Sequence, residues 1–290
     1  MTSNGSSATS SGTFAIGGDL VVNRMGYGAM RITGEGVWGE PPDRDAAKDV
    51  LRRAVELDVN LIDTADSYGP DVSERLIGEA LEPGADGLVV ATKGGLTRSG
   101  PGQWAANGHP EHLREACEGS LARLGVERID LYQLHSPDSD VPFEESVGTL
   151  AELRSEGKVR HVGLSNVSTG ELATAQEIVP IVSVQNRYSI TDRAAEDVLE
   201  ACEELAIGFL PWFPLAAGSA TRPGGLLDRV ADAHGATQAQ IALAWLLARS
   251  PVMLPIPGTS SVEHLEENIA AAEIELSDEE LAELDAVAAA

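Results

Sequence analysis

Four polar side chains stand at the ends of neighbouring apolar segments or just after them, and their types suit the reduction of a carbonyl group: Asp63, Tyr68, Lys93 and His135. Hydride addition to a carbonyl carbon leaves negative charge on the oxygen, which then needs a proton. Tyr68 can give that proton if the ammonium of Lys93 stabilises the phenolate and lowers the tyrosine pKa. Asp63 would keep Lys93 charged, and His135 would donate a hydrogen bond to the carbonyl oxygen. No side chain donates hydride, so this chemistry requires a cofactor.

Each of these residues has a simpler interpretation when it is taken alone. Lys93, one of only three lysines in the chain, could form a purely structural ion pair with Asp63. Tyr68 could be a tyrosine of a surface loop, and His135 a hydrogen-bonded histidine near the core. The convergence of all four at the ends of neighbouring strands favours the catalytic interpretation.

A metal-dependent hydrolase is a different enzyme class that the same region could serve, with Asp63, Asp66 and His135 as ligands. Metal sites in barrels usually need two histidines close together. His109 and His112 lie on a loop or helix start, away from the strand ends, so no metal is expected.

Eight short apolar segments alternate with longer helical patterns along the chain. A typical helical pattern is residues 44–58, where apolar side chains recur at a spacing of three and four. Near-continuous apolar strands between helices predict a parallel sheet buried on both faces, and eight such units predict an α/β fold of the (β/α)8 barrel type. An open doubly wound sheet is the structural alternative, but residues 26–30 (GYGAM) do not match the G-x-G-x-x-G turn that it needs. The segments are 25–30, 60–64, 88–93, 129–135, 159–165, 181–186, 207–213 and 252–257.

Other local patterns place the ends of elements. Residues 13–22 predict a β-hairpin around Gly17-Gly18 that caps the N-terminal end of the barrel. Residues 1–12 predict a flexible polar tail, and residues 13–290 one barrel domain. Capping-box patterns mark four helix starts: Ser168 with Glu171, Thr237 with Gln240, Ser260 with Glu263, and Ser277 with Glu280.

The composition restricts the partners of the chain. Its 290 residues carry a net charge of −26, which disfavours nucleic acid and anionic membranes. The two cysteines are too few for a disulfide framework, and no apolar run is long enough to span a membrane. Without a signal-peptide pattern, a cytoplasmic location is expected.

Several motifs, in order, resemble the aldo-keto reductase family over residues 13–285. The family is a (β/α)8 barrel that binds NADP(H) across the C-terminal ends of its strands, and the resemblance makes Asp63, Tyr68, Lys93 and His135 the catalytic set. It implies an NADP(H)-dependent oxidoreductase that acts on a small-molecule carbonyl substrate. The matching segments are IDTADSYG at 62–69, SERLIGEAL at 73–81, VVATKGG at 89–95, LGVERIDLYQLHSPD at 124–138, GKVRHVGLSN at 157–166, SVQNRYS at 183–189 and IPGTSSVEHLEEN at 256–268.

The same resemblance assigns the cofactor contacts by position. The nicotinamide amide would bind Ser165, Asn166 and Gln185, and its ring would stack on Trp212, where the family commonly has tyrosine. The loop of residues 214–218 would cover the pyrophosphate. The remaining implied cofactor residues are Gly28, Ala29, Met30, Pro214, Leu215, Gly218, Ile256, Gly258, Thr259, Ser260, His264, Glu267 and Asn268.

The chain departs from the best-known family pattern at the adenosine end of the cofactor. Gly258 and His264 stand where many members have Lys and Arg, so two positive charges for the 2′-phosphate are missing. Hydroxyls and free N–H groups at a helix start can still hold a phosphate. NADPH is therefore expected, with weaker discrimination against NADH.

Within the family the chain resembles a bacterial branch that includes pyridoxal reductases, which makes pyridoxal a candidate substrate. The expected pocket lining is Tyr27, Met30, Trp38, Trp104 and Phe213, although the two tryptophans could instead pack on the barrel rim. An alternative function is a non-catalytic NADP(H)-binding subunit, as in the similar channel β-subunits. The oligomeric state stays open.

Overall fold

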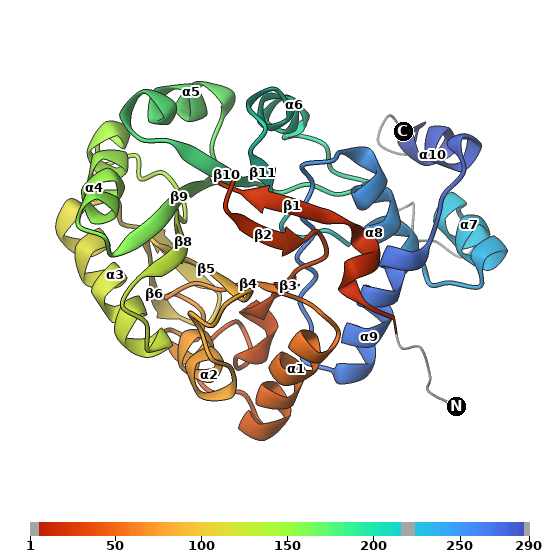
Figure 1. The fold of residues 1–290 in the computed structure, drawn as a ribbon, viewed down its shortest axis with the longest axis horizontal. Coiled ribbons are helices and arrows are strands. Elements are labelled where there is room, and N and C mark those ends of the chain that lie inside the picture. Colours follow the sequence, from red (N-terminus) through yellow and green to blue (C-terminus); the bar gives the residue numbers. More distant parts are fainter. Residues whose placement is uncertain (1–5, 216–223, 287–290) are drawn as a thin grey trace.

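The computed structural model describes residues 6–215 and 224–286. Within them, parallel strands form one curved sheet in the order β11-β10-β9-β8-β5-β4-β3, ringed by helices (Figure 1). This is the predicted (β/α)8 barrel, with each strand close to an apolar segment of the sequence. The strands are β3 (Tyr27–Gly28), β4 (Leu61–Asp63), β5 (Val89–Gly94), β8 (Ile129–Leu134), β9 (Val159–Ser165), β10 (Ile181–Gln185) and β11 (Gly208–Phe209).

The eighth apolar segment, residues 252–257, closes the barrel between β11 and β3 without forming a regular strand. The N–H of Leu254 donates to the carbonyl of Phe209 at 2.8 Å, and the N–H of Gly26 donates to the carbonyl of Pro255 at 2.9 Å. Pro255 and Pro257 have no N–H to donate, which explains why the ladder stops short. Residues 252–257 thus occupy the place of the predicted eighth strand but do not form its regular hydrogen-bond ladder.

Helices cover the outside of the sheet and bury their apolar faces against it. Helix α1 (Arg44–Glu56), for example, buries Ala47, Val50, Leu51 and Ala54. Its periodicity predicts these four and also Val55, which lies at the edge of the face and is 40% exposed. Full burial of a side chain of the size of Val50 or Leu51 is worth about 1.5–3 kcal/mol. No described helix is both long and apolar enough to cross a membrane. The others are α2 (Val72–Ala80), α3 (Pro110–Leu124), α4 (Phe143–Ser155), α5 (Thr169–Ile178), α6 (Glu196–Leu205), α7 (Leu226–His234), α8 (Gln238–Arg249), α9 (Val262–Ala270) and α10 (Asp278–Asp285), with short 3-10 turns η1 (Ala8–Ser11), η2 (Ala29–Ile32) and η4 (Ala271–Glu273).

Capping boxes at Ser168, Thr237 and Ser277 are confirmed. The prediction at Ser260 is wrong, because Ser261 caps α9 and accepts the N–H of His264. The cap lies one residue later than predicted. The hydroxyl of Thr259 accepts the N–H of Ser261, which keeps Ser261 outside the helix.

The predicted N-terminal hairpin is present as β1 (Thr13–Ile16) and β2 (Leu20–Asn23). Its side chains Ile16, Leu20 and Val22 pack on inward-facing residues of the barrel strands, so the hairpin plugs the N-terminal opening. The turn of the hairpin is held to strand β9, because the Asp19 carboxylate lies 2.6 Å from the His161 ring nitrogen Nε2.

The tail predicted over residues 1–12 is not a tail at Ala8–Ser11, which form η1. Ala8 is fully buried and donates its N–H to the carbonyl of Leu57 at 2.8 Å. The hydroxyl of Ser11 accepts the N–H of Met25 at 2.9 Å. Small side chains fit this tight contact, and satisfied hydrogen bonds hold it. Residues 1–5 lie outside the described part.

A second hairpin, β6 (Leu96–Gly100) and β7 (Gln103–Ala106), follows β5 and was not expected from the sequence. Because it leaves the sheet at the C-terminal end of β5, it lies at the same end of the barrel as the four predicted catalytic side chains.

Candidate active site

Asp63 and Lys93 form a buried ion pair at the C-terminal ends of β4 and β5. The Lys93 Nζ lies 2.6 Å from Asp63 Oδ2 and also donates to the carbonyl of Thr64 at 2.9 Å. The second oxygen of Asp63 accepts the side-chain amides of Gln185 at 2.8 Å and Gln133 at 3.2 Å. Burial acts to lower the pKa of the Lys93 ammonium, but the charge and hydrogen bond of Asp63 together with those of Tyr68 outweigh it, so that pKa lies above its ordinary value. This direction favours the charged form of Lys93.

Tyr68 lies in the loop after β4 with its hydroxyl 3.4 Å from Lys93 Nζ. Burial raises the pKa of Tyr68 above its ordinary value, although the Lys93 ammonium pulls it downward. Lys93 thus acts on the Tyr68 pKa in the expected direction, but desolvation of the phenolate is the larger effect, so the net pKa is raised and not lowered. The phenol stays protonated at neutral pH, so its hydroxyl can donate a proton while its oxygen accepts the hydrogen bond from Lys93.

His135 follows β8 and faces the ring of Tyr68, with ring centroids 5.8 Å apart. Its Nδ1 lies 3.3 Å from the hydroxyl of Ser67. Burial, the Lys93 charge and the Arg98 charge together hold the pKa of His135 well below its ordinary value. The imidazole is therefore neutral and carries one hydrogen, whose position depends on the tautomer.

A cavity of about 190 Å³ opens beside this cluster. Asp63, Tyr68 and Gln185 reach it from the barrel, and its other walls are mostly apolar. A mostly apolar cleft with a few convergent polar groups is typical of a cofactor or substrate site. The lining residues are Gly28, Met30, Arg31, Asp63, Tyr68, Gln185, Trp212, Phe213, Pro214, Leu215, Ile256, Pro257 and Gly258.

The indole of Trp212 is fixed at the wall of this cavity. Its Nε1 donates to the side-chain oxygen of Asn166 at 3.0 Å, and Asn166 in turn donates to the carbonyl of His135 at 2.9 Å. Asn166 adopts a left-handed backbone conformation, with φ of 59°, to reach both partners. A planar ring held in this way offers a ready stacking face for a nicotinamide.

Two glycines let the backbone close in on the floor of the cavity. A Cβ on Gly258 would stand 2.7 Å from the carbonyl oxygen of Gly28, and a Cβ on Gly28 would stand 2.7 Å from the carbonyl oxygen of Ile256. Only glycine fits at either position. The flat floor, the fixed indole and the polar groups fit a nicotinamide cofactor.

The structure places the predicted cofactor residues in two groups. Eight of them line the cavity: Gly28, Met30, Gln185, Trp212, Pro214, Leu215, Ile256 and Gly258. The others flank it or lie further along, with Ala29, Ser165, Thr259 and Asn268 buried, Ser260, His264 and Glu267 exposed near the start of α9, and Asn166 behind Trp212. Gly218 lies outside the described residues.

The predicted amide-binding residues are partly engaged within the protein. The Asn166 side chain uses its oxygen for Trp212 and its nitrogen for His135, and it also bonds the Ser165 hydroxyl. Gln185 uses its nitrogen for Asp63. The side-chain oxygen of Gln185 has no hydrogen-bond partner among the residues that the structure describes.

Three of the five predicted pocket residues, Tyr27, Trp38 and Trp104, do not line the cavity. Trp38 lies instead near the Arg98 guanidinium, whose carbon is 5.7 Å from its ring centroid. Tyr27 is fully buried, and its hydroxyl donates to the carbonyl of Thr259 at 2.6 Å, so it does not line the pocket. Side chains alternate along a strand, and on β3 it is Gly28 that faces the cavity. Phe213 and Met30 do line the cavity. Trp104 instead stands against Tyr68, with ring centroids 6.3 Å apart.

Several residues of the site were not predicted. Gln133 holds Asp63, Ser67 contacts His135, and Arg31 lines the cavity. A polar Gln inside the apolar run 129–135 was an available indication for Gln133. No sequence pattern indicated Arg98, whose charge acts on His135, because Arg98 lies on the unexpected β6–β7 hairpin.

The described residues hold no group of three or more His, Cys, Asp or Glu side chains placed to bind a metal. In particular, Asp63 has an ammonium and two amides as its partners.

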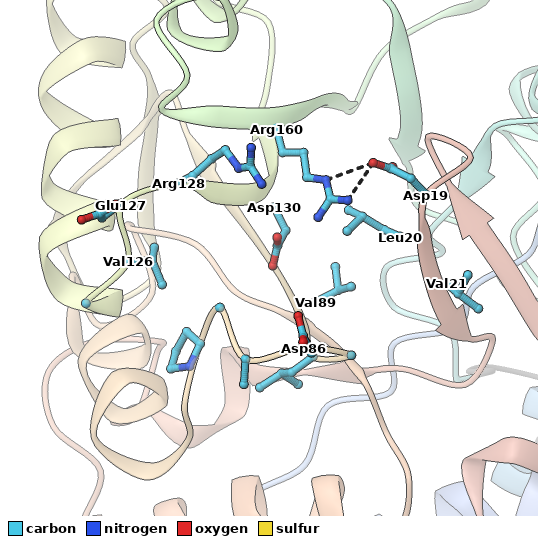
Figure 2. A pocket seen from close by; sticks show the side chains of 16 residues that line it. Asp19, Leu20, Val21, Asp86, Val89, Val126, Glu127, Arg128, Asp130 and Arg160 are labelled. Carbon is cyan, nitrogen blue, oxygen red and sulfur yellow. Dashed lines mark hydrogen bonds and ion pairs between the residues drawn. The ribbon is translucent and has the colours of Figure 1, made fainter.

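A second cavity, of about 660 Å³, lies at the opposite end of the barrel (Figure 2). It is framed by the β1–β2 turn and by the loops that enter β5 and β8. Its charged residues include Asp19, Asp86, Arg128, Asp130 and Arg160.

Comparisons with known proteins agree with this geometry. Residues 24–289 match the aldo/keto reductase family. An uncharacterized oxidoreductase of Schizosaccharomyces pombe is 52% identical over 278 residues, which cover 96% of this chain and 90% of that protein. The pyridoxine 4-dehydrogenase of Escherichia coli is 44% identical over 285 residues, which cover 96% and 99% of the two chains.

Solved structures give the same result. A glycerol dehydrogenase from Gluconobacter oxydans superposes with a TM-score of 0.84 at 27% identity, covering 96% of this chain and 95% of its own. An aldo-keto reductase from Klebsiella pneumoniae in complex with NADPH has a TM-score of 0.79 at 29% identity, covering 94% and 93%. The chain therefore belongs to the aldo/keto reductase family and is an oxidoreductase that uses a nicotinamide cofactor.

Proposed function

We propose that the protein reduces an aldehyde or ketone to an alcohol with NADPH, with Tyr68 as the proton donor. The observation that carries the proposal is the opening of Tyr68 and Asp63 onto one cavity, with the Lys93 ammonium directly behind them. When bound, the cofactor supplies the hydride. Trp212, Met30, Leu215 and the Gly28–Gly258 floor would hold it.

The proton transfer follows from the buried cluster. Tyr68 donates its hydroxyl proton to the oxygen of the substrate as that oxygen gains charge. The phenolate left behind is stabilised by Lys93, whose Nζ is 3.4 Å away. Asp63 keeps Lys93 charged and points it at Tyr68, while the neutral His135 orients the carbonyl by a hydrogen bond.

A preference for NADPH is supported by the charge at the edge of the cavity. Gly258 leaves no room for the lysine that many family members have there, because Gly28 O would clash with any Cβ. The side chain of Arg31 passes over this point, with Cγ 3.6 Å from the position of that Cβ. Arg31 has no carboxylate within 4.0 Å among the described residues, so its charge is available for a phosphate.

Pyridoxal is the first substrate to test. The relative from Escherichia coli is named for pyridoxine 4-dehydrogenation, the reverse of pyridoxal reduction, and its similarity extends over nearly its whole length. The aromatic surfaces of Phe213, Trp212 and Trp104 near Tyr68 suit a planar ring.

The experiment is a substrate panel with purified protein, in which NADPH consumption is followed by its absorbance. The panel holds pyridoxal, an aromatic aldehyde, an α-dicarbonyl and a ketosteroid. Turnover of at least one carbonyl, abolished in Tyr68→Phe, supports the proposal. Tight NADPH binding without turnover of any of them would instead favour the non-catalytic cofactor-binding subunit.

A further inference from the structure

Arg98, on β6, uses its whole guanidinium to hold backbone carbonyls. All of its N–H-bearing atoms donate at 2.8–3.3 Å, and no carboxylate lies within 4.0 Å among the residues described. The five carbonyls match the five N–H donors of the guanidinium, so its hydrogen-bonding capacity is fully used. The five acceptors are the carbonyls of Gly36, Val37, Ser67, Gly100 and Gln103.

These carbonyls belong to three separate segments, which also touch one another directly: the N–H of Gly69 donates to the carbonyl of Val37 at 3.3 Å, and the N–H of Gly102 donates to the carbonyl of Gly36 at 3.1 Å. Gly36 and Val37 lie in the loop between η2 and α1. Ser67 is the neighbour of Tyr68 and itself contacts His135. Gly100 and Gln103 form the turn of the β6–β7 hairpin. The Arg98 side chain therefore adds five hydrogen bonds to the contacts that hold the hairpin and the η2–α1 loop against the loop that carries the proton donor.

The guanidinium also lies over the face of an exposed aromatic ring. Its carbon is 3.5 Å from the ring centroid of Trp104 and 5.7 Å from that of Trp38. The Trp104 indole is 39% exposed, and its ring meets those of Tyr68 and His135 at centroid distances of 6.3 Å. A cation in contact with an indole face restrains that ring.

We propose that Arg98 is a positioning residue, which fixes the Trp104 indole beside Tyr68 and His135 and thereby makes the enzyme select planar aromatic carbonyl substrates. The proposal rests on the carbonyl reductase function argued above. A ring stacked beside the proton donor gains affinity from aromatic contact, whereas a short aliphatic aldehyde has nothing to stack.

Lysine cannot replace Arg98 in this role. An ammonium offers three donors from one point, whereas the five carbonyls surround a planar fork. Arg98→Lys therefore keeps the charge and removes the geometry. Arg52→Lys, on the outer face of α1 where Arg52 pairs with Asp49, is the matched control.

The kinetic experiment compares benzaldehyde with propanal. We expect Arg98→Lys to raise the KM for benzaldehyde by about tenfold to a hundredfold and to change the KM for propanal by less than about twofold. In a Trp104→Ala background the same substitution should have no further effect on benzaldehyde. An equal loss for both aldehydes, or an undiminished loss in the Trp104→Ala background, would overturn the proposal.

Two further measurements separate this proposal from its premise and from simple damage to the fold. NADPH affinity, measured by fluorescence titration, should be unchanged in Arg98→Lys because Arg98 does not line the cofactor cavity. Amide hydrogen exchange should become faster in residues 36–39 and 96–106, and not in the Arg52→Lys control. If the protein turns over no carbonyl, the proposed reductase function is rejected. The anchoring role of Arg98 is rejected separately if hydrogen exchange is unchanged in both segments of Arg98→Lys.

Discussion

The two ends of the barrel each hold a cavity, and the larger one is at the end without the reactive groups. The N-terminal cavity, which Figure 2 shows, has a volume of about 660 Å³. The C-terminal cavity has a volume of about 190 Å³. In the first, the Arg160 and Asp19 side chains bond at 2.7 Å but stay 30% and 50% exposed. In the second, Lys93 and Asp63 pair at 2.6 Å with at most 3% of either exposed.

The difference shows that cavity size does not identify the site. A solvated ion pair contributes little and can be placed almost anywhere on a surface. A buried one costs so much desolvation that its partners must be held by further bonds, as Gln133 and Gln185 hold Asp63. We therefore expect the reaction at the C-terminal end, where hydrogen bonds offset the desolvation of the buried ion pair. The N-terminal end, which the β1–β2 hairpin closes, is expected to contribute to the stability of the fold.

The largest difference between the two ends is expected for Tyr68→Phe, which tests whether the reaction takes place at the C-terminal end. Loss of the proton donor should reduce kcat by about 10²–10⁴-fold while NADPH still binds, measured by absorbance kinetics and a binding titration. Arg128→Gln, at the large N-terminal cavity, should leave kcat within about twofold. A Tyr68→Phe enzyme with near-normal turnover would move the chemistry elsewhere.

Removing one member of each ion pair tests the energetic side. Lys93→Met leaves the Asp63 carboxylate buried without its cation, so we expect a loss of about 3–5 kcal/mol in the free energy of unfolding together with loss of turnover. Arg160→Met breaks the solvated pair at the other end and should cost about 1 kcal/mol or less. Denaturant titration of both variants decides; equal losses would contradict the assignment.

Arg31→Gln sharpens the cofactor assignment. If Arg31 contacts the 2′-phosphate, NADPH affinity should fall by about tenfold or more, because one charge-assisted hydrogen bond is worth about 1.5–3 kcal/mol. NADH affinity should not change, since NADH lacks that phosphate. An equal loss for both cofactors would place Arg31 on a group that they share.

The smallest expected effect concerns pH. Burial and the Glu74 charge hold the pKa of Asp66 well above its ordinary value. The folded state therefore favours the protonated form, so its contribution to stability is full below the unfolded pKa of about 4 and is lost as pH rises through the folded pKa.

The substitution Asp66→Asn should remove that loss. Its free energy of unfolding, relative to that of the unmodified protein, should be higher at pH 8 than at pH 4. Asp130, whose pKa burial also raises at the N-terminal end, provides the comparison through Asp130→Asn. A stability difference between Asp66→Asn and the unmodified protein that does not vary with pH would refute the assigned protonation of Asp66.

Much of this organisation was predictable from strand ends alone. Parallel strands bring their C-terminal residues together, so the sequence alone predicts that Asp63, Lys93 and His135 lie side by side. The facing of a two-residue strand was not predictable, which is why Tyr27 was wrongly assigned to the pocket. A helix start that moves by one residue, as at Ser261, depends on a local turn that the capping pattern does not specify.

The wall around Trp104 could not be predicted for a different reason. Its segment 96–106 has no apolar alternation, and it is held by the non-local bonds of Arg98 to carbonyls such as those of Val37 and Ser67. Contacts between loops that lie far apart in the chain leave no periodic pattern in a sequence.

The meeting of Gly28 with Gly258 has a consequence for the life of the chain. The cavity floor joins the first and last segments of the barrel, and the bond from Tyr27 to Thr259 across the same seam spans 232 positions. A dinucleotide seated there would act as a clasp on the ring, adding its own binding free energy to keep the seam shut. A nascent chain would have no place for the dinucleotide until its last barrel segment had been made, so capture of the ligand would report that the ring is complete.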